Sequence, residues 1–241
     1  MVLWPGLMDR QYQLTGQLVV ILLAYTSLAS GILFFIIPST SNPCSQQPCL
    51  TLSQLADNST VILQNCSNVT LLFLSGNHSL DREILFADVD SVSLSKFIET
   101  VHVTCRIQSG MFKIHQISNV TIKGLNFIGC GGNRVTQVTQ FKVQDTTFLG
   151  MEGSGTALTL NGIEAFFFRC YFFSNTNHRN AAFQKGGAVF AHNSSLLVAD
   201  STFTGNAANI GGVMSMVGGS CLLYTSPSPR DATLSRMPSS A

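Results

Sequence analysis

Charge is scarce throughout this 241-residue chain. Asp, Glu, Lys and Arg make up 10% of the residues, whereas about a quarter is usual for a soluble domain. The formal net charge is +1, and the basic residues form no patch or stripe. Proteins that bind nucleic acid need such a concentration of positive charge, so no nucleic-acid partner is expected. Another kind of group must therefore keep the surface soluble.

The patterns of common metal and catalytic sites are missing as well. None of the seven cysteines forms a Cys-x-x-Cys pair, and no two of the five histidines are four residues apart. No Gly-x-Ser-x-Gly sequence, the signature of one class of serine hydrolases, is present. We therefore expect no metal ion, no cofactor and no catalytic residue, and the leading hypothesis is a protein without enzymatic activity.

One long apolar segment occupies residues 17–37, and no charged residue lies between Arg10 and Asp57. It is long enough to cross a bilayer as a helix, and it is followed by the small residues Ser39, Thr40 and Ser41. Residues 1–41 are therefore predicted to be a signal peptide cleaved near Ser39–Ser41, or an uncleaved helical signal-anchor. The rest of the chain is predicted to be secreted or displayed on the cell surface, with membrane contact only through an uncleaved N-terminal segment.

Glycans are the predicted solubilising groups, because acceptor sequences for N-glycosylation are frequent. They occur at Asn58, Asn65, Asn68, Asn77, Asn119 and Asn193. In the oxidising compartment that these sites indicate, cysteines form disulfides, although the sequence leaves their pairing open. The candidates are Cys44, Cys49, Cys66, Cys105, Cys130 and Cys170. We expect a Cys44–Cys49 bridge to close an N-terminal cap over residues 42–66, with a short amphipathic helix at 52–56.

The chain changes character after Ser220. Residues 221–241 are rich in Pro and Ser and resemble translated sequencing adapter, although a genuine linker has a similar composition. We interpret them as a tail that is foreign to the natural protein, which is then expected to continue beyond this fragment. Removing Cys221 with the tail leaves an even number of cysteines.

Four segments share one template, in which an alternating apolar strand is followed by a turn position and a Phe. These residues, Phe127, Phe148, Phe172 and Phe203, are 21, 24 and 31 residues apart. Such periods indicate a solenoid, and short apolar strands indicate the β kind. Residues 67–220 are therefore predicted to form a parallel β-helix. Stacked coils place equivalent residues about 4.8 Å apart, so the four Phe rings are expected to stack inside.

Small residues recur at the predicted corners of the coils. The glycine pairs Gly186-Gly187 and Gly211-Gly212 begin a second strand element, and we expect them to form tight turns with positive φ. Asn175 and Asn206, three residues after their Phe, are expected in the left-handed region, which Asn tolerates.

These motifs resemble a known family of repeats. Phe172-x-x-Asn175 and Phe203-x-x-Asn206, together with Gly-Gly-Ala-Val from Gly186, are similar to the repeats of polymorphic outer membrane proteins. The N-terminal segment, cap and glycosylation sites also resemble β-helix proteins predicted in sponges. The resemblance implies an all-β, right-handed, single-stranded parallel β-helix of the pectin-lyase type, here with an N-terminal hydrophobic helix. It also implies surface display and adhesion.

Asp145, Arg169 and Asp200 share the turn position three residues before the Phe, where stacking would place Arg169 between two carboxylates. One interpretation is a ligand-binding face, and the other is a charge-balanced ladder without a ligand. We expect a binding or structural module with an extracellular glycan or protein partner. The alternative is a polysaccharide lyase or hydrolase that uses these carboxylates.

Overall fold

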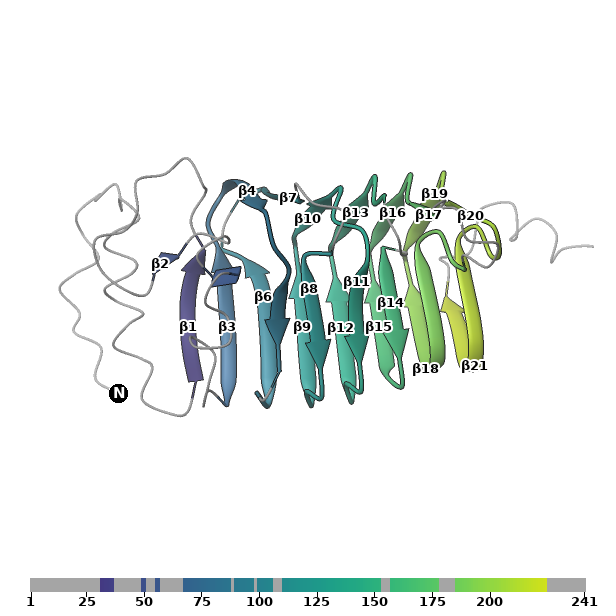
Figure 1. The fold of residues 1–241 in the computed structure, drawn as a ribbon, viewed down its shortest axis with the longest axis horizontal. Coiled ribbons are helices and arrows are strands. Elements are labelled where there is room, and N and C mark those ends of the chain that lie inside the picture. Colours follow the sequence, from purple (N-terminus) through teal and green to yellow (C-terminus); the bar gives the residue numbers. More distant parts are fainter. Residues whose placement is uncertain are drawn as a thin grey trace, which may run out of the picture.

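The structure is a computed structural model, and it describes residues 31–36, 49–50, 55–56, 67–87, 89–97, 99–105, 110–152, 157–177 and 185–224. Over these residues the chain is a parallel β-solenoid, in which strands pair with their equivalents one coil away (Figure 1). The predicted all-β solenoid is therefore confirmed. Within the described residues, no helix is long and apolar enough to cross a bilayer.

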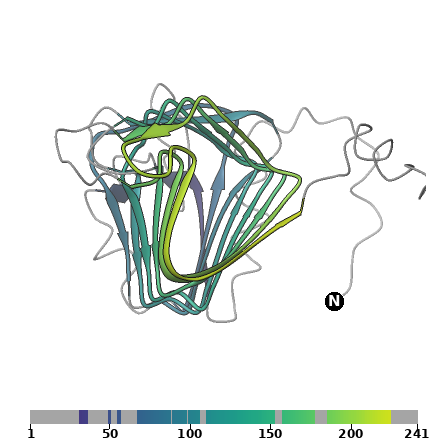
Figure 2. The same cartoon turned by 90° about the vertical axis from the view of Figure 1, so that its right-hand side faces the viewer.

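Each coil contributes strands to three faces, which form a rough triangle when viewed along the axis (Figure 2). The first face contains β3 (Asn68–Phe73), β6 (Ser91–Lys96), β9 (Asn119–Lys123), β12 (Gln140–Gln144) and β15 (Glu164–Phe168). The second face is a six-stranded sheet of β4 (Gly76–Leu80), β7 (Val101–Cys105), β10 (Asn126–Ile128), β13 (Thr147–Leu149), β16 (Tyr171–Phe173) and β19 (Thr202–Thr204). The third face contains β5 (Ile84–Phe86), β8 (Phe112–His115), β11 (Asn133–Thr136) and β14 (Leu158–Asn161).

Two long strands connect the third face to the first. β18 (Val189–Ala199) pairs with β14 through its first half and with β15 through its second half. β21 (Met214–Tyr224) is the last described strand, and it pairs in parallel with both halves of β18. The short strands β17 (Thr176–Asn177) and β20 (Ala207–Ala208) pair beside the second face.

The two ends of the chain are described only in part. Residues 1–30 of the predicted signal or anchor lie outside the described residues, whereas Gly31–Ile36 form β1, which pairs with β3 and with β2 (Cys49–Leu50). Of the predicted cap helix, Leu55 and Ala56 are described with helical backbone, and Leu55 is fully buried. Of the predicted foreign tail, residues 221–224 continue β21 and the remainder lies outside the description.

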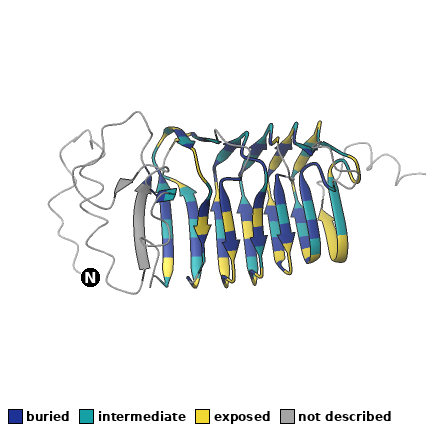
Figure 3. Cartoon of the chain, in the orientation of Figure 1, coloured by how far each residue is buried: buried dark blue, intermediate teal, exposed yellow. Residues whose placement is uncertain are grey.

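The inward residues of the strands form one continuous core. Along most strands buried and solvent-facing residues alternate, as the period of two in a β-strand requires (Figure 3). The predicted Phe stack is confirmed: Phe127, Phe148, Phe172 and Phe203 occupy equivalent positions on the second face. Successive ring centroids are 5.3, 4.8 and 4.7 Å apart, and all three pairs are stacked.

The early coils fill the same interior differently. Val103 and His78 occupy the positions that precede Phe127 in the column, which explains why the sequence template fades there. Other faces supply the missing volume: Phe73 packs edge-on against His78, and Phe112 packs edge-on against Phe127. The early coils still form strands, with Val69, Val92, Val101 and Phe112 in β3, β6, β7 and β8.

The glycine pairs have two separate functions at the corner that precedes the third face. Gly186 and Gly211 have φ of 67° and 64°, the left-handed conformation that the sequence predicted. Gly187 instead permits two coils to approach closely, because a Cβ at this position would lie 2.0 Å from the carbonyl oxygen of Gly212. The predicted positive φ is absent at Gly187 and Gly212. Both glycines of the first pair are needed for steric reasons, whereas a Cβ at Gly212 would come no closer than 3.4 Å to another atom.

The expected left-handed turns at Asn175 and Asn206 are wrong. The residues that adopt positive φ are their predecessors, Ser174 at 51° and Gly205 at 64°. Asn175 is fully buried: its Oδ1 accepts a hydrogen bond from the backbone N–H of Met151 at 3.1 Å, and its Nδ2 donates to Oδ1 of Asn206 at 2.7 Å. The side-chain amide of Asn175 thus supplies a hydrogen-bond partner to a backbone N–H group inside the corner. The turn preference of Asn does not predict this role.

Candidate functional site

The predicted turn column lies at the corner between the first and second faces, here called the ladder corner. Gly124, Asp145, Arg169 and Asp200 occupy equivalent places there, with φ between 48° and 71°. Only glycine adopts this conformation without strain, and Asp tolerates it better than Arg does. The structure therefore brings together the three charged residues that the sequence predicted as a ladder.

Arg169 is held on two sides. Its Nε and Nη2 donate hydrogen bonds to the two carboxylate oxygens of Asp145 at 2.6 and 3.1 Å, and its guanidinium lies 4.4 Å from the centroid of the Phe168 ring. A bidentate pair of this kind fixes the orientation of the planar guanidinium. Both side chains remain accessible, with 49% of Arg169 and 34% of Asp145 exposed.

The ion pair determines the charge state of the corner. The hydrogen bond from Arg169 is the main cause of a lowered pKa at Asp145, and the same bond raises the pKa of Arg169. The negative charge of Asp200 raises the pKa of Arg169 further. The pairing thus favours the ionised form of Asp145, whereas a general acid needs a raised pKa.

A group of exposed aromatic side chains, which the repeat template did not predict, lies next to this corner. Phe168, Tyr171 and Phe173 are 37%, 53% and 48% exposed. They alternate with the inward residues Phe167, Cys170 and Phe172, so a strand-period reading of residues 164–173 would have found them. We call Phe168, Arg169, Tyr171 and Phe173 the aromatic band, since all four come from one coil.

The outer surface of the second face is free of charge along its described strands. β16 presents Tyr171 and Phe173, and the neighbouring strands present mainly Thr, Asn, Ser and aliphatic residues. The outward side chains are Asn77, Ser79, His102, Thr104, Asn126, Ile128, Thr147, Leu149, Tyr171, Phe173, Thr202 and Thr204. The band therefore borders a flat, uncharged surface on one side and the ladder corner on the other.

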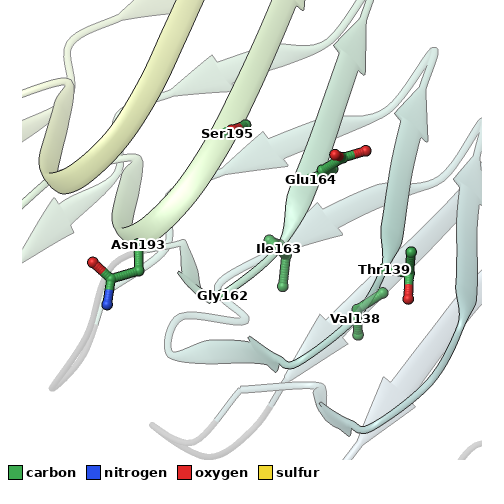
Figure 4. Close-up of a pocket in the computed structure, with 7 residues that line it drawn as sticks. All are labelled: Val138, Thr139, Gly162, Ile163, Glu164, Asn193 and Ser195. Carbon is green, nitrogen blue, oxygen red and sulfur yellow. The ribbon is translucent and has the colours of Figure 1, made fainter.

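An open hollow of about 360 Å³ lies at a different corner, between the third and first faces. Figure 4 shows that its lining residues come from successive coils, with Val138 and Thr139 from one, Ile163 and Glu164 from the next, and Asn193 and Ser195 from β18. Its polar lining contains one carboxylate. Among the described residues, no group of three potential metal ligands exists here or elsewhere.

The predicted glycosylation sites that can be placed are all on the surface. Asn68, Asn77, Asn119 and Asn193 are exposed, whereas Asn58 and Asn65 lie outside the described residues. Asn68 and Asn119 begin strands of the first face and are in register with Ser91 between them. Asn193 lies at the same corner, with φ of 46°, so three sites follow one edge of the solenoid.

The cysteines differ between early and late coils. Cys105 and Cys130 form a disulfide between two successive coils. Cys170 is a buried free thiol that lies 3.4 Å from the carbonyl oxygen of Val143, and burial raises its pKa to about 11. Cys221 is an exposed free thiol. Cys44 and Cys66 lie outside the described residues, as does the Cys49 side chain, and with them the predicted Cys44–Cys49 bridge.

No protein-family model, curated protein or solved structure matches this chain. The likeness to polymorphic outer membrane protein repeats concerns short motifs, and packing explains their residues: Phe172 and Phe203 stack in the core column, and the amides of Asn175 and Asn206 hydrogen-bond at the next corner.

Proposed function

We propose that this chain is an extracellular β-helix module for recognition, with a glycan or protein partner and an adhesive or structural role. The aromatic band carries this proposal. Protein binding surfaces are enriched in aromatic residues and Arg, and these side chains contribute most of the binding affinity. The aromatic band places exposed aromatic rings beside an oriented Arg. A large apolar group gains nothing from exposure on an isolated solenoid, because water contact costs free energy.

Secretion, glycosylation and a right-handed winding belong to the same proposal. Exposure of the four placed acceptor asparagines supports glycosylation, since an acceptor buried in the core could not carry a glycan. The disulfide between Cys105 and Cys130 supports an oxidising compartment. The right-handed winding follows from the motif resemblance and from the preference of parallel crossover connections for that hand.

A binding assay tests the proposal. The chain is expressed in insect cells, and its binding to animal cell surfaces and extracellular matrix is measured by flow cytometry and plate assay. We expect the double variant Tyr171→Thr and Phe173→Thr to lose most of the binding. Leu85→Thr, which removes a side chain 40% exposed on the third face, is the matched control. Equal binding by all three proteins would remove the basis of the proposal.

The competing hypothesis is a polysaccharide lyase or hydrolase centred on Asp145 and Asp200. The lowered pKa of Asp145 and its bidentate pairing with Arg169 favour recognition, because they oppose proton transfer near neutral pH. Release of shortened chains from polygalacturonate by the purified protein, abolished in Asp145→Gly and Asp200→Gly, would establish the enzyme and refute the proposal.

A further inference from the structure

We propose that the aromatic band and the adjoining outer surface of the second face bind a neutral carbohydrate chain. This inference deepens the proposed function, and it selects a carbohydrate in preference to a protein. It rests on three observations: the exposed rings, the absence of charged side chains on the strands of the second face, and the position of the predicted glycans.

The rings provide a platform for sugar rings. Tyr171 and Phe173 are two residues apart on β16 and point outward together, roughly 6–7 Å from each other along the strand. The apolar C–H face of a pyranose packs on such a ring through many small dispersion contacts. Both aromatic side chains stand on a rigid strand that is paired on both sides. A platform of this kind needs no reorganisation to receive a ligand.

Polar groups frame the rings at the positions where sugar hydroxyls would lie. Tyr171 is flanked by Thr147 on one neighbouring strand and by Thr202 on the other, and Phe173 is flanked by Leu149 and Thr204. Hydroxyl groups both donate and accept hydrogen bonds, as sugar hydroxyls do. The oriented Arg169 and the carboxylates of the ladder corner add charged donors and acceptors at one margin.

The charge distribution indicates which carbohydrates fit. The outward side chains of the described second-face strands include no Lys, Arg, Asp or Glu. A polyuronate or sulfated chain would meet Arg169 only at one margin, already paired with Asp145, and would lose hydration along the strands without gaining ion pairs there, which costs free energy. A neutral chain has no such cost, so the surface is complementary to neutral sugars.

The predicted glycans leave this surface open. Asn68, Asn119 and Asn193 follow the opposite corner, between the third and first faces. Asn77 lies on β4, at the other end of the second face from β16. No acceptor site lies on β13, β16 or β19. An incoming chain can therefore reach the band without crossing a glycan of the module itself.

The first test uses an array of defined neutral oligosaccharides, with polygalacturonate and heparan sulfate as charged comparators. We expect at least one neutral oligosaccharide to bind, and Tyr171→Thr and Phe173→Thr each to weaken its binding at least tenfold. Thr occupies equivalent outward positions in adjacent coils, so these variants keep the fold, which circular dichroism verifies. Binding only to the charged comparators, no binding at all, or binding unaffected by both variants would overturn the inference.

The second test places a glycan at the ladder corner. Asp145→Asn creates the acceptor Asn-Thr-Thr, and Asp200→Asn creates Asn-Ser-Thr. The variants are expressed in insect cells, and mass spectrometry identifies the fraction whose new site carries a glycan. This fraction should lose oligosaccharide binding. The matched control is the fraction of the same variant whose new site carries no glycan: it has the same substitution, and it should bind more tightly than the glycosylated fraction. Undiminished binding by the glycosylated fraction would place the ligand elsewhere.

The two proposals fail separately. If the array is negative while binding to cells still depends on Tyr171 and Phe173, the partner is a protein: the recognition module stands and the carbohydrate inference falls. If cell binding is also independent of these residues, both fall.

Discussion

The early and late coils share one backbone path but divide their aromatic residues differently. In the early coils, Phe73, Phe86 and Phe112 lie inside, and the second face presents Asn, Ser, His and Thr outward. In the coil of β15 and β16, aromatic residues point both inward and outward. Inward rings are explained by the core, whereas the rings of Phe168, Tyr171 and Phe173 lie outside it and remain partly exposed. The comparison separates residues that make the solenoid from residues available to a partner.

Substitution of adjacent Phe residues tests this separation most strongly. Phe172 is buried between Phe148 and Phe203, at 4.8 and 4.7 Å, whereas Phe173 is 48% exposed. Phe172→Ala should destabilise the fold by about 3–5 kcal/mol, because a cavity replaces two stacked contacts. Phe173→Ala should change stability by less than about 0.5 kcal/mol. Urea unfolding followed by circular dichroism measures both, and equal losses would contradict the assignment of inside and outside.

The next largest loss of stability is expected when the disulfide between Cys105 and Cys130, which lies in the early coils, is removed. Cys105 and Cys130 are 25 residues apart, and closing a loop of this length stabilises a fold by roughly 3–4 kcal/mol in the chain-entropy model. The double variant Cys105→Ala and Cys130→Ala should therefore unfold at markedly lower urea concentration. If hydrogen exchange accelerates first at β7 and β10, the effect is local to these coils. An unchanged midpoint would show that coil stacking alone suffices.

The third-largest loss of stability is expected when one buried side-chain amide is removed. Asn175→Ala leaves the Met151 N–H without the acceptor that it has in the parent, and a buried unpaired group costs about 1–3 kcal/mol. The control is Asn161→Ala, which removes an exposed amide that contacts His192. Thermal unfolding should distinguish the two. If the control variant lost as much stability as Asn175→Ala, the stabilising role of the buried Asn175 amide would be contradicted.

The thiol of Cys170 offers a kinetic version of the same comparison. Burial raises its pKa to about 11, so at pH 8 the reactive thiolate is a very small fraction. We expect iodoacetamide to label Cys221 in the native protein and to label Cys170 only after unfolding. Peptide mass spectrometry reads both sites in one sample, and fast native labelling of Cys170 would show that the coil opens readily.

The smallest effect concerns the ladder corner. The pKa of Asp145 is lowered in the folded state, so its contribution is present above the unfolded value of about 4 and is lost as pH falls through the folded pKa. Because the pair is exposed, the contribution is below about 1 kcal/mol. Arg169→Asn keeps a residue that tolerates positive φ and creates no glycosylation acceptor. Its stability should fall less between pH 7 and pH 3 than that of the parent.

The repeat template predicted much of the fold. The Phe column, the equivalence of the ladder residues and the positive φ of Gly186 and Gly211 followed from residue spacing, because coil stacking places equal positions over one another. Template matching failed where Val103 and His78 replace Phe, since the core volume there comes from other faces. It also misassigned Asn175, because propensity describes the preference of a single residue for a turn and not the backbone groups that surround it.

The sequence by itself determined the class of fold, the inward direction of the template residues and the stacking of the Phe column, since these apolar residues alternate along the strand and recur once per coil. Tertiary structure decided the neighbours across coils at positions outside the template, because connections of unequal length change the register between repeats. The Cys105–Cys130 bridge, the amide contact between Asn175 and Asn206, and the gathering of Phe168, Tyr171 and Phe173 beside Arg169 all depend on that register.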